Sequence, residues 1–206
     1  PVRCRVMSTT IHRQRLFVAS CVALVVTAMS FAIRTGMMGQ WETEFALSKT
    51  QVGWIAGTAF WGFTVAMVIG GPLCDVLGMK RLVWLACVGH LASILLTVFA
   101  TGFWTLYIGT LLIGIGNGFV EAACNPLIAT LYPDDKAHKL NQFHVWFPGG
   151  IVIGALAAFG LGELGMGWRW QNALMIPPLI AYAFLFMGQG FPRTERVESG
   201  VSTGKM

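Results

Sequence analysis

A carboxylate stands within one of the most apolar stretches of the chain, with an amide side chain four residues to either side. The stretch reads GIGNGFVEAACNPL and contains Asn117, Glu121 and Asn125. Because each step of four residues turns an α-helix only about 40° past a full turn, the three side chains share one helical face. A carboxyl group held away from water can exchange a proton, and flanking amides can hydrogen-bond it or a polar solute. The spacing therefore predicts proton exchange or solute binding on one face of a helix.

A second ionisable side chain, Arg34, lies in a separate apolar run, on a helical face similar to that of Thr27 and Ser30. Its position near one end of the run leaves two interpretations open. Either the long side chain extends outward to water, or it enters the interior and forms an ion pair with Glu121 or a site for a substrate anion. The second interpretation favours an acidic sugar or another carboxylate as the solute.

Two further pairs of side chains could contact a solute. Thr58 and Trp61 supply a hydroxyl and an aromatic ring, a combination that suits a sugar ring in an apolar pocket, and a packing stripe is the alternative. Asn141 and His144 begin another apolar run, where His144 could titrate near neutral pH or form only a local hydrogen bond. All four are candidate site residues.

The composition places these residues in a membrane. Of the 206 residues, 55% are hydrophobic and 11% are charged, whereas soluble domains carry about 25% charged residues. The five cysteines have no regular spacing and are interpreted as small apolar residues: Cys4, Cys21, Cys74, Cys87 and Cys124. The sequence has no phosphate-binding loop, metal-ligand spacing or Ser/His/Asp set, so we predict no enzyme, no metal and no cofactor beyond a coupling proton.

Six apolar runs are long enough to cross a bilayer as α-helices, which takes about 20 residues each. They cover residues 16–39, 51–73, 82–100, 104–131, 140–162 and 170–190. Strands of a membrane barrel would be about 10 residues long with alternating polarity, so the predicted fold class is an all-α membrane protein with six transmembrane helices. Glycines four residues apart predict close helix contacts at three pairs: Gly53 and Gly57, Gly114 and Gly118, and Gly150 and Gly154.

The distribution of basic residues sets the orientation. Most of the 14 lysine and arginine residues fall on one side of the predicted membrane: Arg3, Arg5, Arg13, Arg15, Lys80, Arg81, Lys136, Lys139, Arg193, Arg196 and Lys205. Lys49 and Arg169 fall on the other side. Because basic loops stay in the cytoplasm, we expect both termini there and the protein in the plasma (inner) membrane. The same distribution accounts for the net charge of +5, so we predict no nucleic-acid binding.

This orientation divides the chain into three parts. Residues 1–15 are predicted to be a cytoplasmic tail, 16–190 the six-helix bundle, and 191–206 a second cytoplasmic tail or the start of a central linker. The sequence begins with Pro1, and the run MSTTIHRQR from Met7 reads as a natural start.

The segment after the second run reads GGPLCDVLGMKRL and resembles the signature loop of the major facilitator superfamily between its second and third helices. The matching residues are Gly71, Asp75, Gly78, Lys80 and Arg81, while Val76 and Met79 replace basic residues of the pattern. Close helix contact at Gly71, a tight turn at Gly78 and a carboxylate at Asp75 suit these positions. The resemblance implies half of that fold, with a three-plus-three inverted repeat, in which Asp75 contacts a helix of a second half and locks the outward-open state.

Within the superfamily, residues 110–154 are most similar to the fucose–proton symporter group. The matching residues are Glu121, Ala123, Asn125 and Pro126 of a Glu-x-Ala-x-Asn-Pro run in the fourth helix, and Lys139, Leu140 and Asn141 of a run that opens the fifth. The resemblance implies proton-coupled import of a sugar-like solute. At the Asn/Asp pair of the group's first helix this sequence has Arg34 and Thr35, and Thr110 stands at the place of a fourth-helix arginine.

We therefore expect half of a secondary transporter that moves a small polar solute, a sugar or sugar acid, by proton-coupled alternating access. An organic or inorganic anion is the alternative solute. The expected partners are the lipid bilayer, the solute, and either a carboxy-terminal six-helix half or a second protomer that completes the cavity. A truncated remnant or assembly module that does not transport is the alternative from another class.

Overall fold

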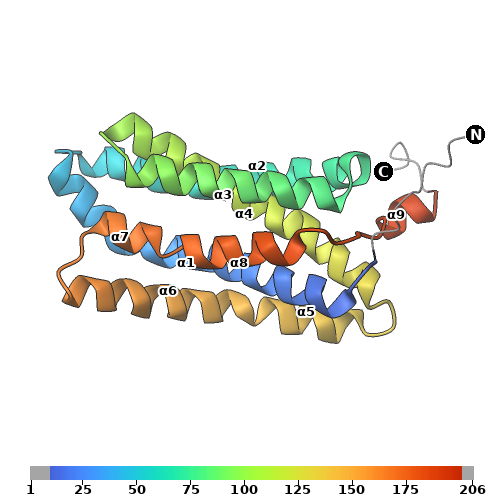
Figure 1. The fold of residues 1–206 in the computed structure, drawn as a ribbon. Helices are drawn as coiled ribbons and strands as arrows, with labels where there is room; N and C mark the ends of the chain where they lie inside the picture. The colour runs from blue at the N-terminus through green and yellow to red at the C-terminus, as the bar shows by residue number, and fades with distance from the viewer. Residues whose placement is uncertain (1–9, 201–206) are drawn as a thin grey trace, which may run out of the picture.

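The computed structural model describes residues 10–200, which form α-helices and, within that range, no strand. The long helices run alongside one another in a bundle (Figure 1). Their bounds are Arg13–Glu44 for α1, Lys49–Leu77 for α2, Met79–Val98 for α3, Phe103–Leu131 for α4, Lys136–His144 for α5, Trp146–Glu163 for α6, Trp168–Ala173 for α7, Ile176–Phe186 for α8 and Glu195–Glu198 for α9.

Five segments of the described chain are long and apolar enough to cross a membrane, namely α1, α2, α3, α4 and the segment formed by α5 and α6. The sixth predicted run forms α7 and α8, which follow one line in Figure 1 but are separated at Leu174 and Met175. Together these segments give six crossings, so the all-α prediction is confirmed. The helices extend past the predicted apolar runs. For example, α1 covers Arg13–Glu44, whereas the predicted run covers 16–39.

A proline follows each of the two interruptions. Proline has no N–H group, and its ring clashes with the carbonyl group four residues earlier. Pro148 follows His144, the last residue of α5, by four residues. Pro177 likewise follows Ala173, the last residue of α7, by four residues. The first break places His144 at the end of a short helix that contacts α4.

Residues in the connections between crossings determine where the helices begin and end. Ser48 begins α2 with a capping box, in which its hydroxyl accepts from the Gln51 N–H and the Gln51 side chain accepts from the Ser48 N–H. Gly78 ends α2 with a φ of 83°, a conformation that residues with a side chain rarely adopt, and α3 begins at the next residue. The structure therefore has the tight turn predicted at Gly78.

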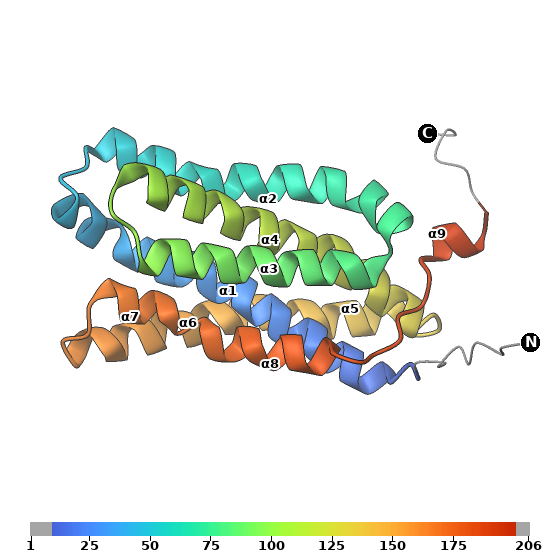
Figure 2. The same ribbon diagram turned by 45° about the horizontal axis from the view of Figure 1, so that its top comes forward.

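The membrane crossings pack in two groups, joined by a contact between α1 and α4. α4 lies against α2 and α3, while α1 lies against α6 and α8, and α1 and α4 meet between the two groups. Figure 2 shows this arrangement, with α2, α3 and α4 on one side of α1 and α6, α7 and α8 on the other. The first crossing thus packs among the last three, and the fourth packs among the first three, as expected for a pair of three-helix repeats.

Glycine permits the closest of these contacts. A Cβ atom added to Gly118 would lie 2.6 Å from the Ala66 Cβ of α2, and one added to Gly154 would lie 2.9 Å from the backbone of α1. The close contacts predicted for these two glycine pairs are therefore present. At Gly53 and Gly57 an added Cβ would meet no atom of the described chain within 4 Å. The prediction for that pair is wrong within this chain, because α2 leaves its glycine face open.

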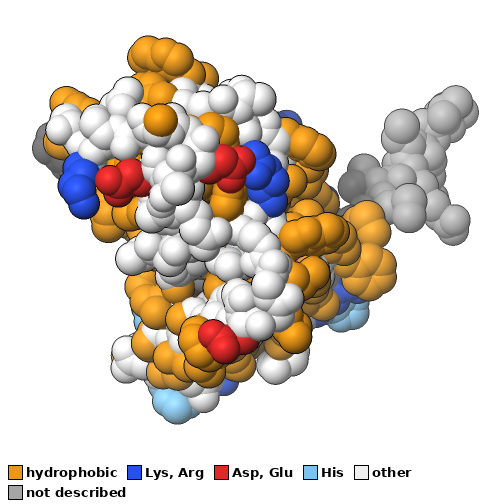
Figure 3. All heavy atoms as spheres, turned by 90° about the vertical axis from the view of Figure 1, so that its left-hand side faces the viewer, with side chains coloured by type: hydrophobic (Ala, Val, Ile, Leu, Met, Phe, Trp, Pro, Cys, Tyr) orange, Lys and Arg blue, Asp and Glu red, His pale blue; other side chains and the backbone are white. Residues whose placement is uncertain are grey.

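Charged side chains gather at the two ends of the bundle. Figure 3 views the end that carries the α1–α2 and α6–α7 connections, where acidic side chains lie beside basic ones. The pairs are Lys49 with Glu42 at 3.9 Å and Arg169 with Glu44 at 2.7 Å. The start of α1 and α9 lie at the opposite end (Figure 1), as an even number of crossings requires. Residues 1–9 and 201–206 of the predicted tails lie outside the described residues, with Arg3, Cys4, Arg5 and Lys205 among them.

Candidate functional site

Glu121 lies within α4, and 7% of its surface is exposed. The side-chain nitrogen of Asn125, one helical turn later, donates to Glu121 Oε2 at 2.8 Å and to the Glu121 carbonyl oxygen at 3.0 Å. Asn125 Oδ1 lies 3.1 Å from Nε2 of His144, an exposed residue of α5. The structure therefore joins a buried carboxyl group to an exposed imidazole through one amide.

The end of α5 holds the imidazole in this place. α5 stops at His144, and the preceding residue, Phe143, is fully buried. The two rings meet edge to face with their centroids 4.9 Å apart. Phe143 thus anchors the end of the helix in the bundle while His144 remains open to its surroundings.

The hydrogen bonds of the Glu121–Asn125–His144 cluster have a defined direction. Because the Asn125 amide nitrogen donates to Glu121, its oxygen is the acceptor, and His144 Nε2 carries the hydrogen of the next bond. The cluster therefore connects a buried carboxyl group to an exposed ring nitrogen through hydrogen bonds whose donors and acceptors are fixed.

Asn117 joins a different cluster, although it precedes Glu121 by about one helical turn. Its side-chain nitrogen donates to Ser30 Oγ at 2.9 Å, and its oxygen lies 3.0 Å from His90 Nε2. His90 Nδ1 lies 3.1 Å from the Tyr182 hydroxyl oxygen. All four members of this second cluster are buried, and they connect α1, α3, α4 and α8. Asn117 therefore lies in the bundle interior and does not share the surroundings of Glu121 and Asn125, contrary to the prediction from its spacing.

Arg34 is buried between α1, α3 and α4, with 3% of its surface exposed. Nη1 donates to Thr110 Oγ1 at 2.7 Å, and Nη2 donates to Ser93 Oγ at 2.9 Å and to Thr97 Oγ1 at 3.4 Å. The expectation of an outward-extending side chain is therefore wrong. The ion pair expected with Glu121 is not formed either, because every salt bridge among residues 10–200 involves another cation.

The remaining candidates from the apolar runs do not meet. Thr58 is buried against α4, and its hydroxyl donates to the Ile55 carbonyl oxygen at 2.7 Å. Trp61 lies on the open face of α2, with 71% of its surface exposed. Asn141 is exposed on α5, about one turn before His144. The sugar pocket expected from Thr58 and Trp61 is therefore not formed by this part of the chain alone.

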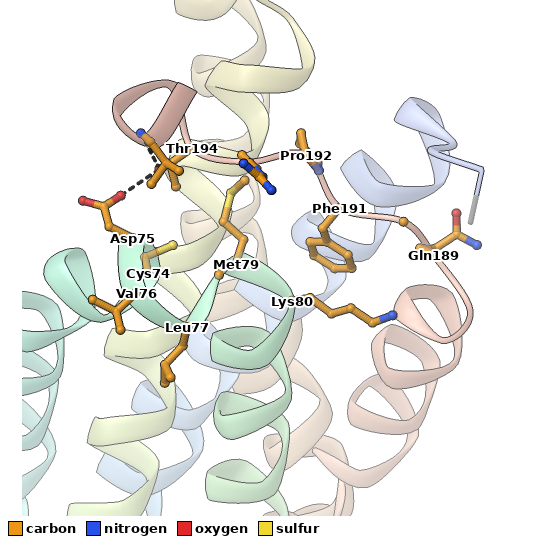
Figure 4. A pocket seen from close by; sticks show the side chains of 14 residues that line it. Cys74, Asp75, Val76, Leu77, Met79, Lys80, Gln189, Phe191, Pro192 and Thr194 are labelled. Carbon is orange, nitrogen blue, oxygen red and sulfur yellow. Dashed lines mark hydrogen bonds between the residues drawn. The ribbon is translucent and has the colours of Figure 1, made fainter. Parts of the chain in front are cut away.

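The loop that resembles the superfamily signature lies under the segment after α8. Asp75 Oδ1 accepts a hydrogen bond of 2.7 Å from the Thr194 hydroxyl, and Asp75 Oδ2 lies 3.3 Å from a guanidinium nitrogen of Arg196. Figure 4 shows Asp75 and Thr194 facing each other at one edge of a cavity of about 520 Å³. Thr194 also caps α9 by accepting from the Val197 N–H. Asp75 is thus next to a helix start, as the loop pattern implies, but this helix belongs to the same chain.

The other loop positions differ in their surroundings. Lys80 and Arg81 are exposed at the start of α3, and Figure 4 shows the Lys80 side chain extending toward the segment after α8. Gly71 makes no close contact, because an added Cβ would meet nothing within 4 Å. At the preceding residue, Gly70, an added Cβ would lie 2.6 Å from the Ala122 Cβ of α4. The close contact expected at Gly71 is therefore shifted by one residue.

Sequence reasoning missed the polar face of α3. His90, Ser93 and Thr97 are all buried, and they supply partners to Asn117 and Arg34. Their spacing of three and four residues marks one helical face, and this is the signal that could have identified them. Tyr182 stands alone in an apolar run, so no spacing in the sequence marks it.

Comparison with known proteins gives one family and several curated relatives. Residues 17–205 match the family model for the Major Facilitator Superfamily. The D-xylose transporter of Levilactobacillus brevis is 26% identical over 148 residues, which cover 71% of this chain and 32% of that protein. The 3-(3-hydroxy-phenyl)propionate transporter of Escherichia coli (strain K12) is 29% identical over 184 residues, which cover 84% of this chain and 42% of that protein.

A solved structure has the same fold. The proton:xylose symporter XylE bound to 6-bromo-6-deoxy-D-glucose matches with a TM-score of 0.80 at 16% identity, over 91% of this chain and 46% of that one. At this identity the likeness shows the fold alone. The chain spans less than half the length of each of these three proteins.

Proposed function

The chain belongs to the major facilitator superfamily, and we propose that it forms the amino-terminal six-helix half of a secondary transporter for a small polar solute, a sugar or a sugar acid. Its similarity to a D-xylose transporter supports this class of solute. As a member of the family it is an integral membrane protein that crosses the bilayer several times. The distribution of basic residues supports a cytoplasmic location for both ends of the described chain.

The observation that carries the proposal is the Glu121–Asn125–His144 cluster. A charged group near the centre of a bilayer costs about 3 kcal/mol on insertion scales, so such a group is a candidate for function. Glu121 has a single amide partner and retains 7% exposure, which allows it to bind and release a proton without breaking an ion pair. The proton is the coupling ion in this proposal, Glu121 is its carrier, and His144 holds Asn125 at the open end of the cluster.

Alternating access needs a second set of helices, since such folds hold the solute between two halves. α2 carries large apolar side chains that are 50–71% exposed, namely Trp54, Phe60, Trp61, Val65, Val68 and Ile69. Gly53 and Gly57 lie on the same helix and leave room for a close backbone approach. These features support a carboxy-terminal six-helix half, or a second protomer, as the partner that covers this face.

The test is uptake by the intact protein in proteoliposomes under an imposed proton gradient, with D-xylose, L-fucose and D-galacturonate as probes. Glu121→Gln keeps the size of the side chain and can still accept from Asn125, but it cannot ionise. We expect this variant to lose gradient-driven accumulation and to keep solute exchange at equal concentrations. Glu163→Gln, which changes an exposed carboxyl group at the end of α6, is the matched control and should behave as the parent.

Accumulation by Glu121→Gln equal to that of the parent would refute the proton-carrying role. If the parent protein transports none of the probes, the transporter proposal itself is refuted for this class of solute.

A further inference from the structure

The Arg34 guanidinium carries a charge that the described chain does not neutralise. Its hydrogen-bond partners, Thr110, Ser93 and Thr97, are neutral hydroxyl groups. Among residues 10–200 no carboxylate lies within salt-bridge distance of it, and its Nε–H group has no partner. A buried cation is costly unless an anion or further acceptors compensate it. One donor and the whole counter-charge are thus left for a group outside residues 10–200.

A second buried donor borders the same small cavity. Trp41 is fully buried, and its indole N–H also lacks a partner within the described residues. Arg34 and Trp41 both line a cavity of about 30 Å³ where α1, α2 and α4 meet. The other walls are mostly apolar, with Phe31, Met38 and Phe60 among them. Two residues that each hold a buried N–H group without a partner in the described chain, one of them a cation, therefore line the same mostly apolar recess.

We propose that this recess binds the carboxylate group of the transported solute, which makes the solute an organic acid. The inference rests on the proposed transporter function, because it names the solute class for that site. Guanidinium and indole N–H groups only donate hydrogen bonds, so they select an oxygen anion over a cation. About 30 Å³ has room for roughly two water-sized groups, which suits the two oxygens of a carboxylate but not a sugar or phenyl ring.

The body of the acid lies outside the recess. Phe60 lines the recess on α2 and is 62% exposed, and the next residue, Trp61, is 71% exposed. Aromatic faces of this kind can stack on the C–H groups of a sugar acid or on the ring of an aromatic acid. The carboxylate head is therefore the shared chemistry, and the two kinds of body are separated by experiment.

The recess is separate from the Glu121–Asn125–His144 cluster. Thr110, which accepts from Arg34, precedes Glu121 by 11 residues, or about 16 Å along a helix. A carboxylate at Arg34 and a proton on Glu121 can therefore be bound at the same time. An anion and a proton carried together leave the net charge of the loaded protein unchanged.

Matched pairs of ligands test the recess with the intact protein in detergent. D-galacturonate and D-galactose differ by a carboxylate in place of a CH₂OH group, and 3-phenylpropionate and 3-phenyl-1-propanol form a second pair with an aromatic body. We expect one acid to bind at least about tenfold more tightly than its neutral partner, measured by calorimetry and by the rise of Tm with ligand concentration. The pair that shows the difference identifies the body of the solute.

Variants of Arg34 and Trp41 test whether their N–H groups bind the carboxylate. Trp41→Phe removes the indole N–H and keeps a buried aromatic ring, so the affinity for the acid should fall about tenfold. Arg34→Gln should abolish the preference for the acid over its neutral partner. Trp104→Phe changes a tryptophan of α4 that is 69% exposed and lies outside the recess, so it should leave the affinity unchanged.

Equal affinity for each acid and its neutral partner would overturn the proposal, as would the absence of binding by both acids. If Arg34→Gln does not fold, the comparison of Trp41→Phe with its control Trp104→Phe tests the proposal. Equal affinity of these two variants for the acid would overturn it. Proton-coupled uptake of D-xylose that neither acid inhibits would overturn the carboxylate recess while supporting the transporter proposal. Specific acid binding without uptake of any solute would support the recess and refute the transporter proposal.

Discussion

Breaking the contact between Asp75 and the segment after α8 should expose the thiol of Cys74. Cys74 is 2% exposed and borders the two cavities on either side of this contact. The Asp75–Arg196 ion pair has a separation of 3.3 Å, and its side chains are 16% and 27% exposed. Exposed pairs contribute up to about 1 kcal/mol, and removing one partner of a buried pair costs more. For Asp75→Asn we expect a loss of about 1 kcal/mol, or roughly a fivefold rise in the open population.

The contact has two components, the Asp75–Arg196 ion pair and a hydrogen bond from the Thr194 hydroxyl to Asp75, and a variant of Thr194 tests the second. The hydroxyl donates to Asp75 at 2.7 Å, and a hydrogen bond to a charged group contributes about 1.5–3 kcal/mol. Asparagine at position 75 can still accept this bond, so Asp75→Asn removes the ion pair and leaves a weaker hydrogen bond to a neutral acceptor. Thr194→Val removes the bond and also the cap of α9, so its effect should be about tenfold or more.

The assay is the rate at which a maleimide labels Cys74 in a variant whose four other cysteines are replaced by alanine. When opening and closing are fast relative to labelling, the rate follows the open population. Asp75→Asn and Arg196→Gln should each raise the rate about fivefold, and the double variant should not multiply the effects, because both remove the same pair. Lys80→Gln, which changes an exposed cation of the same cavity, is the control. An unchanged rate in Asp75→Asn, or an equal rise in Lys80→Gln, would refute the reasoning.

Two further predictions concern the scaffold around the site. Gly118→Ala should lower the free energy of unfolding by about 1–3 kcal/mol, because its Cβ would lie 2.6 Å from that of Ala66. Gly160→Ala in α6, where an added Cβ would meet nothing within 4 Å, should be neutral or stabilise by up to about 1 kcal/mol. Thermal unfolding in detergent compares the two, and equal shifts would contradict the close contact. Asn117→Leu should destabilise by about 1–3 kcal/mol, because it leaves His90 without its partner, and it should leave the pH profile of uptake as in the parent. A displaced pH profile would contradict the separation of the Asn117 and Glu121 clusters.

The crossings could be predicted because their causes are local. A run of about 20 apolar residues, a capping box at Ser48 and a glycine at position 78 each act within a few residues of the chain. The contact between Glu121 and Asn125 is local too, since four residues separate them on one helix. The pairing of Asn125 with His144 is not local, because the short connection from Leu131 to Lys136 brings the end of α4 beside α5 but does not state which faces of the two helices meet.

Depth within an apolar run can be estimated from the sequence, but the direction of a side chain around its helix depends on the neighbours. Arg34 lies near the end of its run, yet it turns toward Ser93 and Thr97 of α3 and away from water. Asn117 and Asn125 differ by about 80° around α4. That difference is large enough for one side chain to face α1 and α3 while the other faces α5.

α4 supplies a hydrogen-bond partner to the proposed carboxylate recess and to the cluster of the proposed proton carrier. Its position therefore limits the helix motions that can couple the two sites. Thr110 accepts from Arg34 of α1, and Asn125 pairs with His144 of α5. α4 is also held against α2 at Gly118, where even one added carbon would collide with the neighbouring helix. Because close-packed backbones do not slide past each other without losing such contacts, α2 and α4 should move as one body. A shift of that body relative to α1 and α5 would break the Arg34–Thr110 and Asn125–His144 bonds together, so the proposed carboxylate recess and the proposed proton carrier would respond to the same movement.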